Sequence, residues 1–315
     1  MKPAFFFLTF LLAVTTLFAQ TKSYKNEIGF QTDNDGFLGT GSDRYYTAGN
    51  FLYFNHALKV TDTTRLANKI LGLELSQKIY TAHSGATTDV YNVDRPFAGY
   101  LYIGAGLNLL YQNQSNLKLQ VQTGFVGPHS YGMEVQDLIH KVFGFYTPSG
   151  WQYQIHDDFE INTSTQYNRL LLHGDNIDVS LNSYANLGTG QTGAGAGLML
   201  RLGKFNQLFN SLSTTSTVSA CGKTVANELF LYYQPIANFV AYNATIQGSI
   251  FESAHAVDEI EKNIEPFLFS QKIGGALVSG HWVADLSVVV ETQEAKNMLY
   301  DQHQWGSLSV LYRFN

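Results

Sequence analysis

Residues 175–188, DNIDVSLNSYANLG, carry the clearest structural signal in the sequence. Their polarity alternates along the chain. One face carries Ile177, Val179, Leu181, Ser183, Ala185 and Leu187, and the other carries Asp178, Ser180, Asn182, Tyr184 and Asn186. Strict alternation is typical of a β-strand between two different environments. The run is also as long as the roughly 9 to 11 tilted residues with which a strand crosses a bilayer.

The same pattern recurs in residues 281–293 and 304–314. Strands of soluble sandwiches are usually only about 5 or 6 residues long. The apolar faces here are too numerous to share one core. In hydrocarbon, only a closed barrel pairs every backbone group of a sheet. The sequence therefore predicts an all-β fold, a transmembrane β-barrel of antiparallel strands.

The composition fits an exported protein. Residues 1–19 combine Lys2, an apolar run and a terminal Ala19, and this pattern predicts a secretory signal peptide. The remaining residues, 20–315, are predicted to form one barrel domain. Beyond the signal, no window has the roughly 18 to 20 apolar residues of a membrane helix. The single cysteine, Cys221, excludes an intramolecular disulfide. A net charge of -6 without a basic stripe argues against a nucleic-acid partner.

Twelve candidate strands follow from alternation and turn residues, an even number as a bacterial single-chain barrel requires. They are 24–32, 46–57, 70–80, 97–111, 117–127, 153–172, 176–188, 192–203, 227–247, 263–278, 281–293 and 304–314. Such barrels have short periplasmic turns and longer external loops. The first strand then runs outward, and the external segments are 33–45, 81–96, 128–152, 189–191, 248–262 and 294–303. The long, Ser/Thr-rich segment 204–226 falls on the periplasmic side and breaks this pattern.

Polar clusters fall in the external segments. Asp33, Asn34 and Asp35 end the first strand, Asp43, Arg44 and Thr47 begin the second, and Asp94 with Arg95 precedes the fourth. Turn chemistry alone accounts for many such Asp and Asn residues. We interpret Asp43, Arg44, Asp94 and Arg95 as charged groups that position the external loops.

The third external segment contains a predicted short helix. Val135, Leu138, Ile139 and Val142 share one stripe, and Gly144 is a suitable C-cap. Gln136 and His140 are four residues apart and therefore project from one face. A helix over the barrel mouth would aim His140 at the carboxylates of the first loop.

Several of these motifs, in their order and spacing, resemble the lipid A 3′-O-deacylases of Gram-negative outer membranes. They are Asn34-Asp35, Tyr46-Thr47-Ala48-Gly49, Asp94-Arg95 with Phe97, Gly127-Pro128, Glu134-Val135-Gln136 with His140, and Trp151 with Gln154. Beyond about residue 156 the resemblance rests on strand pattern. It implies a twelve-stranded barrel in the outer membrane, whose outward-facing site hydrolyses the 3′ ester-linked acyl group of lipid A with Ca²⁺.

Carried over by position, the resemblance implies that His140, Asn34, Asp35 and Thr47 are active-site residues. In the family's proposed chemistry the histidine activates water and a cation near the carboxylate stabilises the oxyanion. An imidazole suits this role near neutral pH, and carboxylate oxygens suit Ca²⁺. We expect Asp35 and Asp33 to supply metal ligands. Gln136, Asp43, Arg44, Asp94 and Arg95 would support the site.

The sequence departs from the family at two positions. A lysine of the family falls near Thr87 or Thr88, which removes a cationic oxyanion or phosphate contact. A glutamate falls near Tyr146, which removes a metal ligand. Lys78, Lys141, Asp137 and Glu134 are the candidate substitutes. The departures leave an altered acyl specificity and an inactive barrel as open alternatives.

The main prediction is a monomeric lipid A esterase whose partners are lipopolysaccharide and outer-membrane lipids. Three other functions are alternatives to it. The first is a pore or lipopolysaccharide-binding barrel without catalysis. The second is an outer-membrane phospholipase, which would use the same histidine. The third is an adhesin, which the His and Asp clusters of the loops disfavour.

Overall fold

The computed structural model describes residues 23–39, 43–220, 227–251 and 259–315. The expected signal peptide, 1–19, and Cys221 lie outside the described residues. No helix of the described ranges is long and apolar enough to span a membrane.

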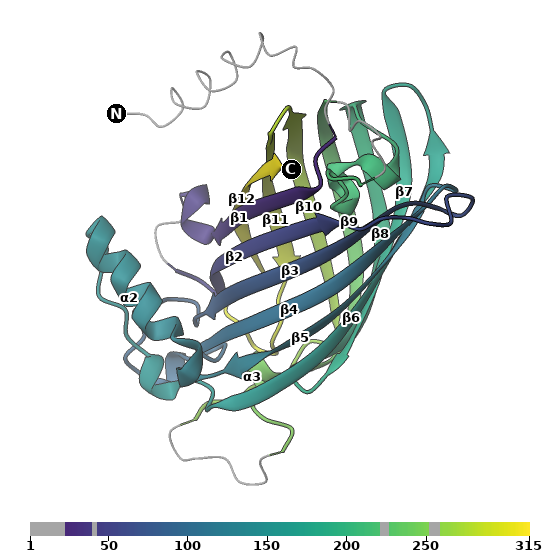
Figure 1. Cartoon of the computed structure of the whole chain (residues 1–315). Coiled ribbons are helices and arrows are strands. Elements are labelled where there is room, and N and C mark those ends of the chain that lie inside the picture. Colours follow the sequence, from purple (N-terminus) through teal and green to yellow (C-terminus); the bar gives the residue numbers. More distant parts are fainter. Residues whose placement is uncertain (1–22, 40–42, 221–226, 252–258) are drawn as a thin grey trace.

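Twelve antiparallel strands close into one barrel, as predicted (Figure 1). The closure joins β1 (Asn26–Asn34) to β12 (Gln302–Phe314), with Phe30 opposite Val310. The strands between them are β2 (Tyr46–Ala57), β3 (Leu66–Tyr80), β4 (Ala98–Tyr111), β5 (Ser115–Val126), β6 (Asp158–His173), β7 (Ile177–Gly188), β8 (Gln191–Lys204), β9 (Glu228–Asn243), β10 (Phe267–Ser279) and β11 (Trp282–Thr292). Each pairs with its neighbour in sequence, so every strand has two partners and the sheet has no open edge.

The two faces of β7 have the environments that the sequence predicts. Ile177 and Leu187 are exposed on the outside of the barrel, whereas Asp178, Ser180 and Asn182 are buried in the lumen. Other strands repeat this arrangement with outward Phe30, Leu52, Leu73, Ile103, Val121, Phe269, Leu286 and Val310. An apolar exterior of this kind is solvated by lipid.

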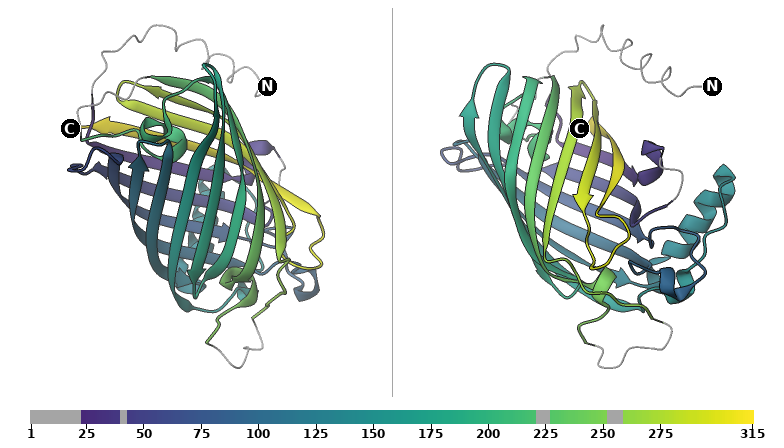
Figure 2. Two further views of the ribbon diagram at one scale, coloured as in Figure 1. Left: turned by 90° about the vertical axis from the view of Figure 1, so that its right-hand side faces the viewer. Right: turned by 180° about the vertical axis from the view of Figure 1, so that it is seen from behind.

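The long connections after β1, β3, β5, β9 and β11 lie at one end of the barrel, and the short turns after β4, β6 and β10 lie at the other end together with the long connection after β8 (Figure 2). Four predicted boundaries differ from the structure by four residues or more: β3 begins at Leu66 and not at 70, β10 begins at Phe267 and not at 263, and the other two have a visible local cause. Strand β6 begins at Asp158 and not at 153, because Trp151–Tyr153 form the 3₁₀ turn η4. Strand β9 ends at Asn243, whose side chain accepts a hydrogen bond from the Thr245 amide and caps the short helix α3 (Ala244–Gln247).

Residues 205–220, the irregular segment after β8, fold into the lumen at the end of the barrel where β1 begins and β12 ends, which is the end predicted to be periplasmic. They contain the 3₁₀ turns η5 (Leu208–Asn210) and η6 (Leu212–Thr214). Asn68 of β3 donates to the Val218 carbonyl at 2.8 Å, Asn108 of β4 donates to Thr214 O at 2.8 Å, and Arg313 of β12 donates to Thr217 O at 3.0 Å. The segment is therefore a plug that three strands hold in place.

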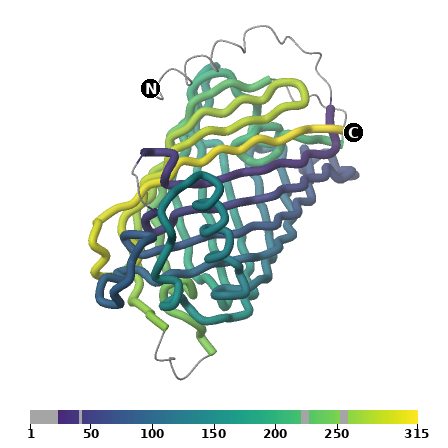
Figure 3. The backbone as a smooth tube through the Cα atoms, turned by 90° about the vertical axis from the view of Figure 1, so that its left-hand side faces the viewer, coloured from purple at the N-terminus to yellow at the C-terminus, as the bar shows by residue number. Residues whose placement is uncertain are grey.

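The helix α2 (Gly132–Phe143) lies against the outside of the barrel wall, not over its mouth (Figure 3). Gly99 of β4 points outward, and a Cβ there would lie 3.1 Å from the Gly132 Cα and would collide with Ser130. Gln77 on the same face of β3 donates to the Ser130 carbonyl at 2.7 Å. A glycine at this position therefore lets the start of α2 rest on the lipid-facing side of the wall.

Candidate active site

Helix α2 is amphipathic in the opposite sense to a helix of a soluble protein. Its buried face is polar and consists of Gly132, Gln136 and His140. Its apolar stripe is exposed: Leu138 is 60% exposed and Val142 is 69% exposed. Phe143 and Phe145 extend this exposed surface past the end of the helix. An apolar helix face beside the lipid-facing wall is placed to contact acyl chains.

His140 is held by acceptors at both ring nitrogens. Its Nε2 lies 2.8 Å from Oδ2 of Asp43, and its Nδ1 lies 2.7 Å from the main-chain oxygen of Tyr146. The ring is only 4% exposed and packs edge-on against the rings of Phe145 and Tyr146. The predicted C-cap at Gly144, with φ of 72°, ends α2 so that residues 145 and 146 fold back over His140.

Asp43 is fixed by a chain of hydrogen bonds behind it. The indole of Trp151 donates to Oε1 of Gln136 at 2.7 Å, and the Gln136 amide donates to Oδ2 of Asp43. The Asp43 amide donates to the Tyr146 hydroxyl at 3.3 Å. Trp151 itself is buried against Phe97 in an apolar cluster on the barrel wall. Trp151 on the barrel wall therefore orients the Asp43 carboxylate through Gln136.

The first loop brings Asp35 and Thr47 together. Asp35 begins the 3₁₀ helix η1 (Asp35–Leu38), which Asn34 caps by accepting from the Gly36 amide at 2.7 Å. Thr47 lies in a β-bulge of β2, and its hydroxyl donates to Asp35 Oδ1 at 3.2 Å. A bulge re-aims a side chain without interrupting the strand. The amide of Arg44 completes the contact by donating to Asp35 Oδ2 at 2.6 Å.

The electrostatics of Asp35 are unusual. Burial, together with the nearby carboxylate of Asp43, raises the pKa of Asp35 from 3.8 to about 8. Burial and the Asp43 carboxylate also raise the pKa of the Tyr146 phenol above its ordinary value. Two carboxylates and a phenol thus converge on one place on the outer wall. A cation placed there would be stabilised by this concentration of negative charge and oxygen donors.

Asp33 lies on the luminal face of β1, where it accepts from the Tyr46 hydroxyl at 2.8 Å and from Gln31 at 2.9 Å. Of the two predicted metal ligands, Asp35 is the one beside Asp43 and Thr47. A ligand role for Asp33, like catalytic roles for the other site residues, stays a prediction.

The remaining supporting residues position loops, with partners that the sequence did not indicate. Asp94 accepts from the Tyr45 hydroxyl at 2.7 Å and from the Leu299 amide at 2.8 Å. Arg95 pairs with Glu294 at 2.8 Å. The guanidinium of Arg44 lies 3.8 Å over the ring of Tyr300. These contacts tie the second and last external loops to the residues that precede β2.

The four candidate substitutes for the missing lysine and glutamate are placed elsewhere. Lys141 pairs with Asp137 on the exposed side of α2. Lys78 lines the luminal cavity, on the other side of the wall. Glu134 is exposed in the first turn of α2. Tyr146 therefore occupies the place beside Asp43 where sequence reasoning noted the loss of a glutamate.

Sequence reasoning interpreted Asp43 as a loop-positioning charge, but the structure makes it the partner of His140. Its contact with Tyr146 was not foreseen either. One available signal was the spacing of Gln136 and His140, since two polar side chains on one helical face require a polar partner when that face is buried.

A family match and one solved structure agree with this architecture. Residues 5–314 match the family described as "Outer membrane protein LpxR". The solved structure of LpxR from Salmonella typhimurium superposes with a TM-score of 0.74 at 20% identity, covering 91% of this chain and 100% of that chain. The β domain of the Bordetella autotransporter BrkA gives a TM-score of 0.46 at 8% identity, covering 94% and 99%. No curated protein sequence matches the chain.

Proposed function

Because the chain belongs to the LpxR family of outer-membrane β-barrel proteins, we propose that it is a Ca²⁺-dependent esterase that removes the 3′ ester-linked acyl group of lipid A. His140 is the general base in this proposal. Asp35, Asn34 and Thr47 form the side of the site that holds the cation and the substrate carbonyl. The site faces the outer leaflet, and the chain acts as a monomer.

One observation carries the proposal: the pair of His140 and Asp43 lies between the outer wall of the barrel and an α2 helix whose exposed face is apolar. A water-soluble substrate would approach a site in the lumen or on a polar loop. An amphiphile in the outer leaflet instead reaches the outer wall by lateral diffusion, with its acyl chains against Leu138, Val142 and Phe143. Ester hydrolysis of a lipid therefore fits this location.

The contacts of His140 decide which ring nitrogen can act as the base. Both nitrogens face acceptors in the described geometry, so catalysis requires one nitrogen to lose its contact. The contact with Asp43 is charge-assisted and therefore the stronger of the two. We assign Nε2–H to Asp43 and the basic lone pair to Nδ1, which becomes available when the Tyr146 carbonyl turns away.

With water at Nδ1, His140 can serve both as the base and as the acid of the hydrolysis. Nδ1 takes a proton from water as the water oxygen bonds to the ester carbon. The tetrahedral intermediate then collapses, breaking the bond to the sugar oxygen, and the imidazolium returns the proton to that oxygen. The products are a fatty acid and a free hydroxyl on the sugar. Asp43 stabilises the imidazolium between the two steps.

The residues present fit a hard cation at Asp35, because burial and the neighbouring Asp43 carboxylate raise its pKa to about 8, and a bound cation would offset the repulsion between the two carboxylates. Asp35 would hold Ca²⁺ together with Asp43 and the hydroxyl of Thr47. When bound, Ca²⁺ would supply electrostatic stabilisation of the oxyanion. Thr47 and the Arg44 amide orient the Asp35 carboxylate for this purpose.

The test uses the purified barrel with lipid A and Ca²⁺, and mass spectrometry of the lipid product. We expect loss of one acyl chain from the 3′ position, dependence on Ca²⁺, and a strongly reduced rate with His140→Gln. Retention of all acyl chains would overturn the proposal. A parallel panel of glycerophospholipids separates it from the phospholipase alternative, which predicts lysophospholipid and free fatty acid.

The pore alternative is disfavoured by the plug. Leu208, Ser211, Thr214 and Ser216 are all buried within the periplasmic end of the lumen. Hydrogen bonds from three strands fix this segment, so the described residues 205–220 obstruct the lumen at that end.

A further inference from the structure

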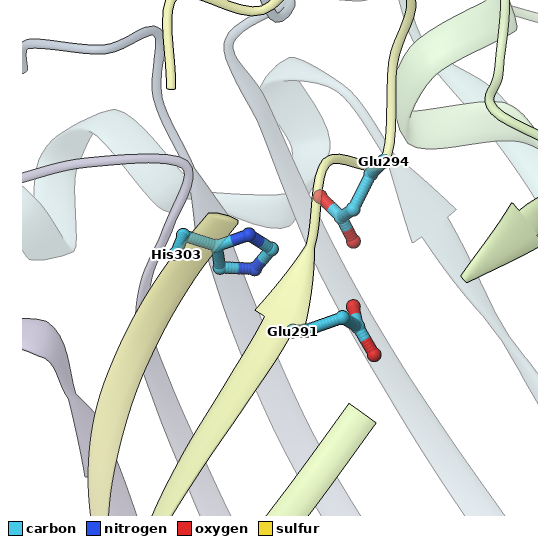
Figure 4. Close-up of side chains that lie close together, drawn as sticks. All are labelled: Glu291, Glu294 and His303. Atoms are coloured by element: carbon cyan, nitrogen blue, oxygen red, sulfur yellow. The ribbon is translucent and has the colours of Figure 1, made fainter. Parts of the chain in front are cut away.

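Three ionisable side chains meet inside the barrel near its outer end. Glu291 of β11 and His303 of β12 face each other across the strand pair, and Glu294 follows β11 two residues after its end. One ligand atom from each lies within 4.8 Å of the other two. Figure 4 shows both carboxylates and the imidazole directed toward a common space. This group is on the luminal side of the wall and does not include His140 or Asp43.

His303 has no hydrogen-bond partner in the described part of the chain. Its ring is 4% exposed, and neither Nδ1 nor Nε2 is satisfied. The ring stacks on Trp305 at 5.3 Å and meets Tyr45 edge-on at 5.8 Å, so packing fixes its plane. Buried polar groups in proteins are rarely left unpaired without a reason. An unpaired imidazole nitrogen directed toward two carboxylates is suited to bind a metal ion.

Two cationic side chains lie near the group, and one of them pairs with a carboxylate directly. The guanidinium of Arg95 donates to Oε2 of Glu294 at 2.8 Å, and is held in turn by Pro96 O and Thr245 Oγ1. The ammonium of Lys78 adds a second positive charge that acts on both carboxylates. The Arg95 guanidinium lies 4.1 Å from the ring of Tyr80, which holds it on one side of Glu294.

We propose that Glu291, Glu294 and His303 bind a divalent transition-metal ion, with Zn²⁺ the best match. An imidazole with two carboxylates supplies three N/O ligands, and water completes a tetrahedral site. Tetrahedral ligands at bond lengths of about 2 Å lie roughly 3.3 Å apart, so small side-chain rotations close the present spacing. Ca²⁺ prefers six to eight oxygen ligands and is therefore a poor match for this set.

The metal would staple the β11–β12 hairpin at its outer end. The loop of this hairpin carries Tyr300, whose ring lies over the Arg44 guanidinium. The Tyr300 amide donates to the Tyr45 hydroxyl at 3.2 Å. Asp35, Arg44 and residues 300–304 line one cavity of about 440 Å³. The inferred metal therefore supports the loop that forms one wall of the cavity beside Asp35, a cavity that His303 itself lines.

The experiment measures Zn²⁺ binding by the full barrel in detergent after chelation, by equilibrium dialysis and elemental analysis in excess Ca²⁺. We expect one Zn²⁺ per chain. His303→Phe preserves the aromatic packing on Trp305 and should abolish stoichiometric binding, and Glu291→Gln should weaken it at least tenfold. The matched control is His129→Gln, which removes an exposed histidine paired with Asp157 and should leave binding unchanged.

A measurement on the unsubstituted chain keeps the proposal testable if a variant fails to fold. X-ray absorption at the zinc edge should show one imidazole nitrogen and otherwise oxygen ligands. Absence of a stoichiometric Zn²⁺ from the wild-type barrel would overturn the proposal, as would several imidazole ligands or unchanged binding by folded His303→Phe. None of these readouts depends on esterase activity, so they stand apart from the proposed function.

Discussion

The imidazole Nε2 of His140 lies 2.8 Å from Oδ2 of Asp43, although one residue belongs to the helix on the outer wall and the other to the first external loop. The pair links the two elements that border the site. Gln136, one turn before His140 on the same face of α2, donates to the same carboxylate oxygen. The relationship gives the histidine an orientation and a stabilising charge, which are two requirements of a general base.

Replacement of His140 tests the base directly. We expect His140→Gln to lower kcat for lipid A hydrolysis by about 10²- to 10⁴-fold, because general-base assistance contributes that much. Acyl release is measured by mass spectrometry on protein whose barrel fold is checked by gel mobility before heating. His129→Gln is the control. Equal activity of His140→Gln and wild type would exclude the base role.

Replacement of Asp43 tests the partner. Asp43→Asn keeps the size of the side chain but removes the charge that stabilises the imidazolium, so we expect kcat to fall by about 10²-fold or more with little change in KM. It also removes a like charge from Asp35, and the pKa of Asp35 should move down from about 8. A fall in substrate affinity alone, with kcat preserved, would instead assign Asp43 a purely structural role.

The pKa of Asp35 predicts how Ca²⁺ binding depends on pH. In the folded protein without cation, burial and Asp43 hold this pKa at about 8, so at lower pH a proton must leave before Ca²⁺ binds. The apparent affinity should therefore fall about tenfold for each pH unit below 8 and level off above it. Calorimetric titration at pH 6, 7, 8 and 9 measures this. Asp35→Asn should bind weakly at every pH, and a flat profile in wild type would contradict the prediction.

The exposed stripe of α2 predicts a dependence on the lipid environment. Leu138→Asp with Val142→Asp places two charges on the face directed toward the membrane. We expect roughly a tenfold loss on lipid A in vesicles, since charge near hydrocarbon is costly, but little loss on lipid A dispersed in detergent. Glu134→Gln on the same helix is the control. Equal losses in both assays would indicate that the variant damages the fold of α2.

The plug predicts that the wild-type barrel does not conduct ions. Planar-bilayer recording should show no steady conductance, because residues 205–220 are packed into the lumen. Replacing residues 207–225 with a short Gly-Ser linker should open a channel while the twelve strands stay paired. A conducting wild type would support the pore alternative.

The strand pattern was predictable because each side chain of a barrel strand faces either lipid or the lumen. Ile177 is apolar and faces outward, whereas its neighbour Asp178 is charged and faces the lumen, so the difference appears in adjacent residues. The helix in the third external segment and its C-cap at Gly144 were likewise local features. The fold of residues 205–220 was not predictable, because its hydrogen bonds run to strands far away in the sequence.

The closed barrel, the gathering of the polar loops at one end of it, and the shared face of Gln136 and His140 could all be inferred from the sequence, since they follow from periodicity along the chain. The position of α2 on the outer wall, the pairing of Asp43 with His140, and the convergence of Glu291, Glu294 and His303 in the lumen became visible in the folded chain alone. The physical reason is that these contacts depend on which loops fold back over which strands, and packing between distant segments leaves no periodic trace in either one.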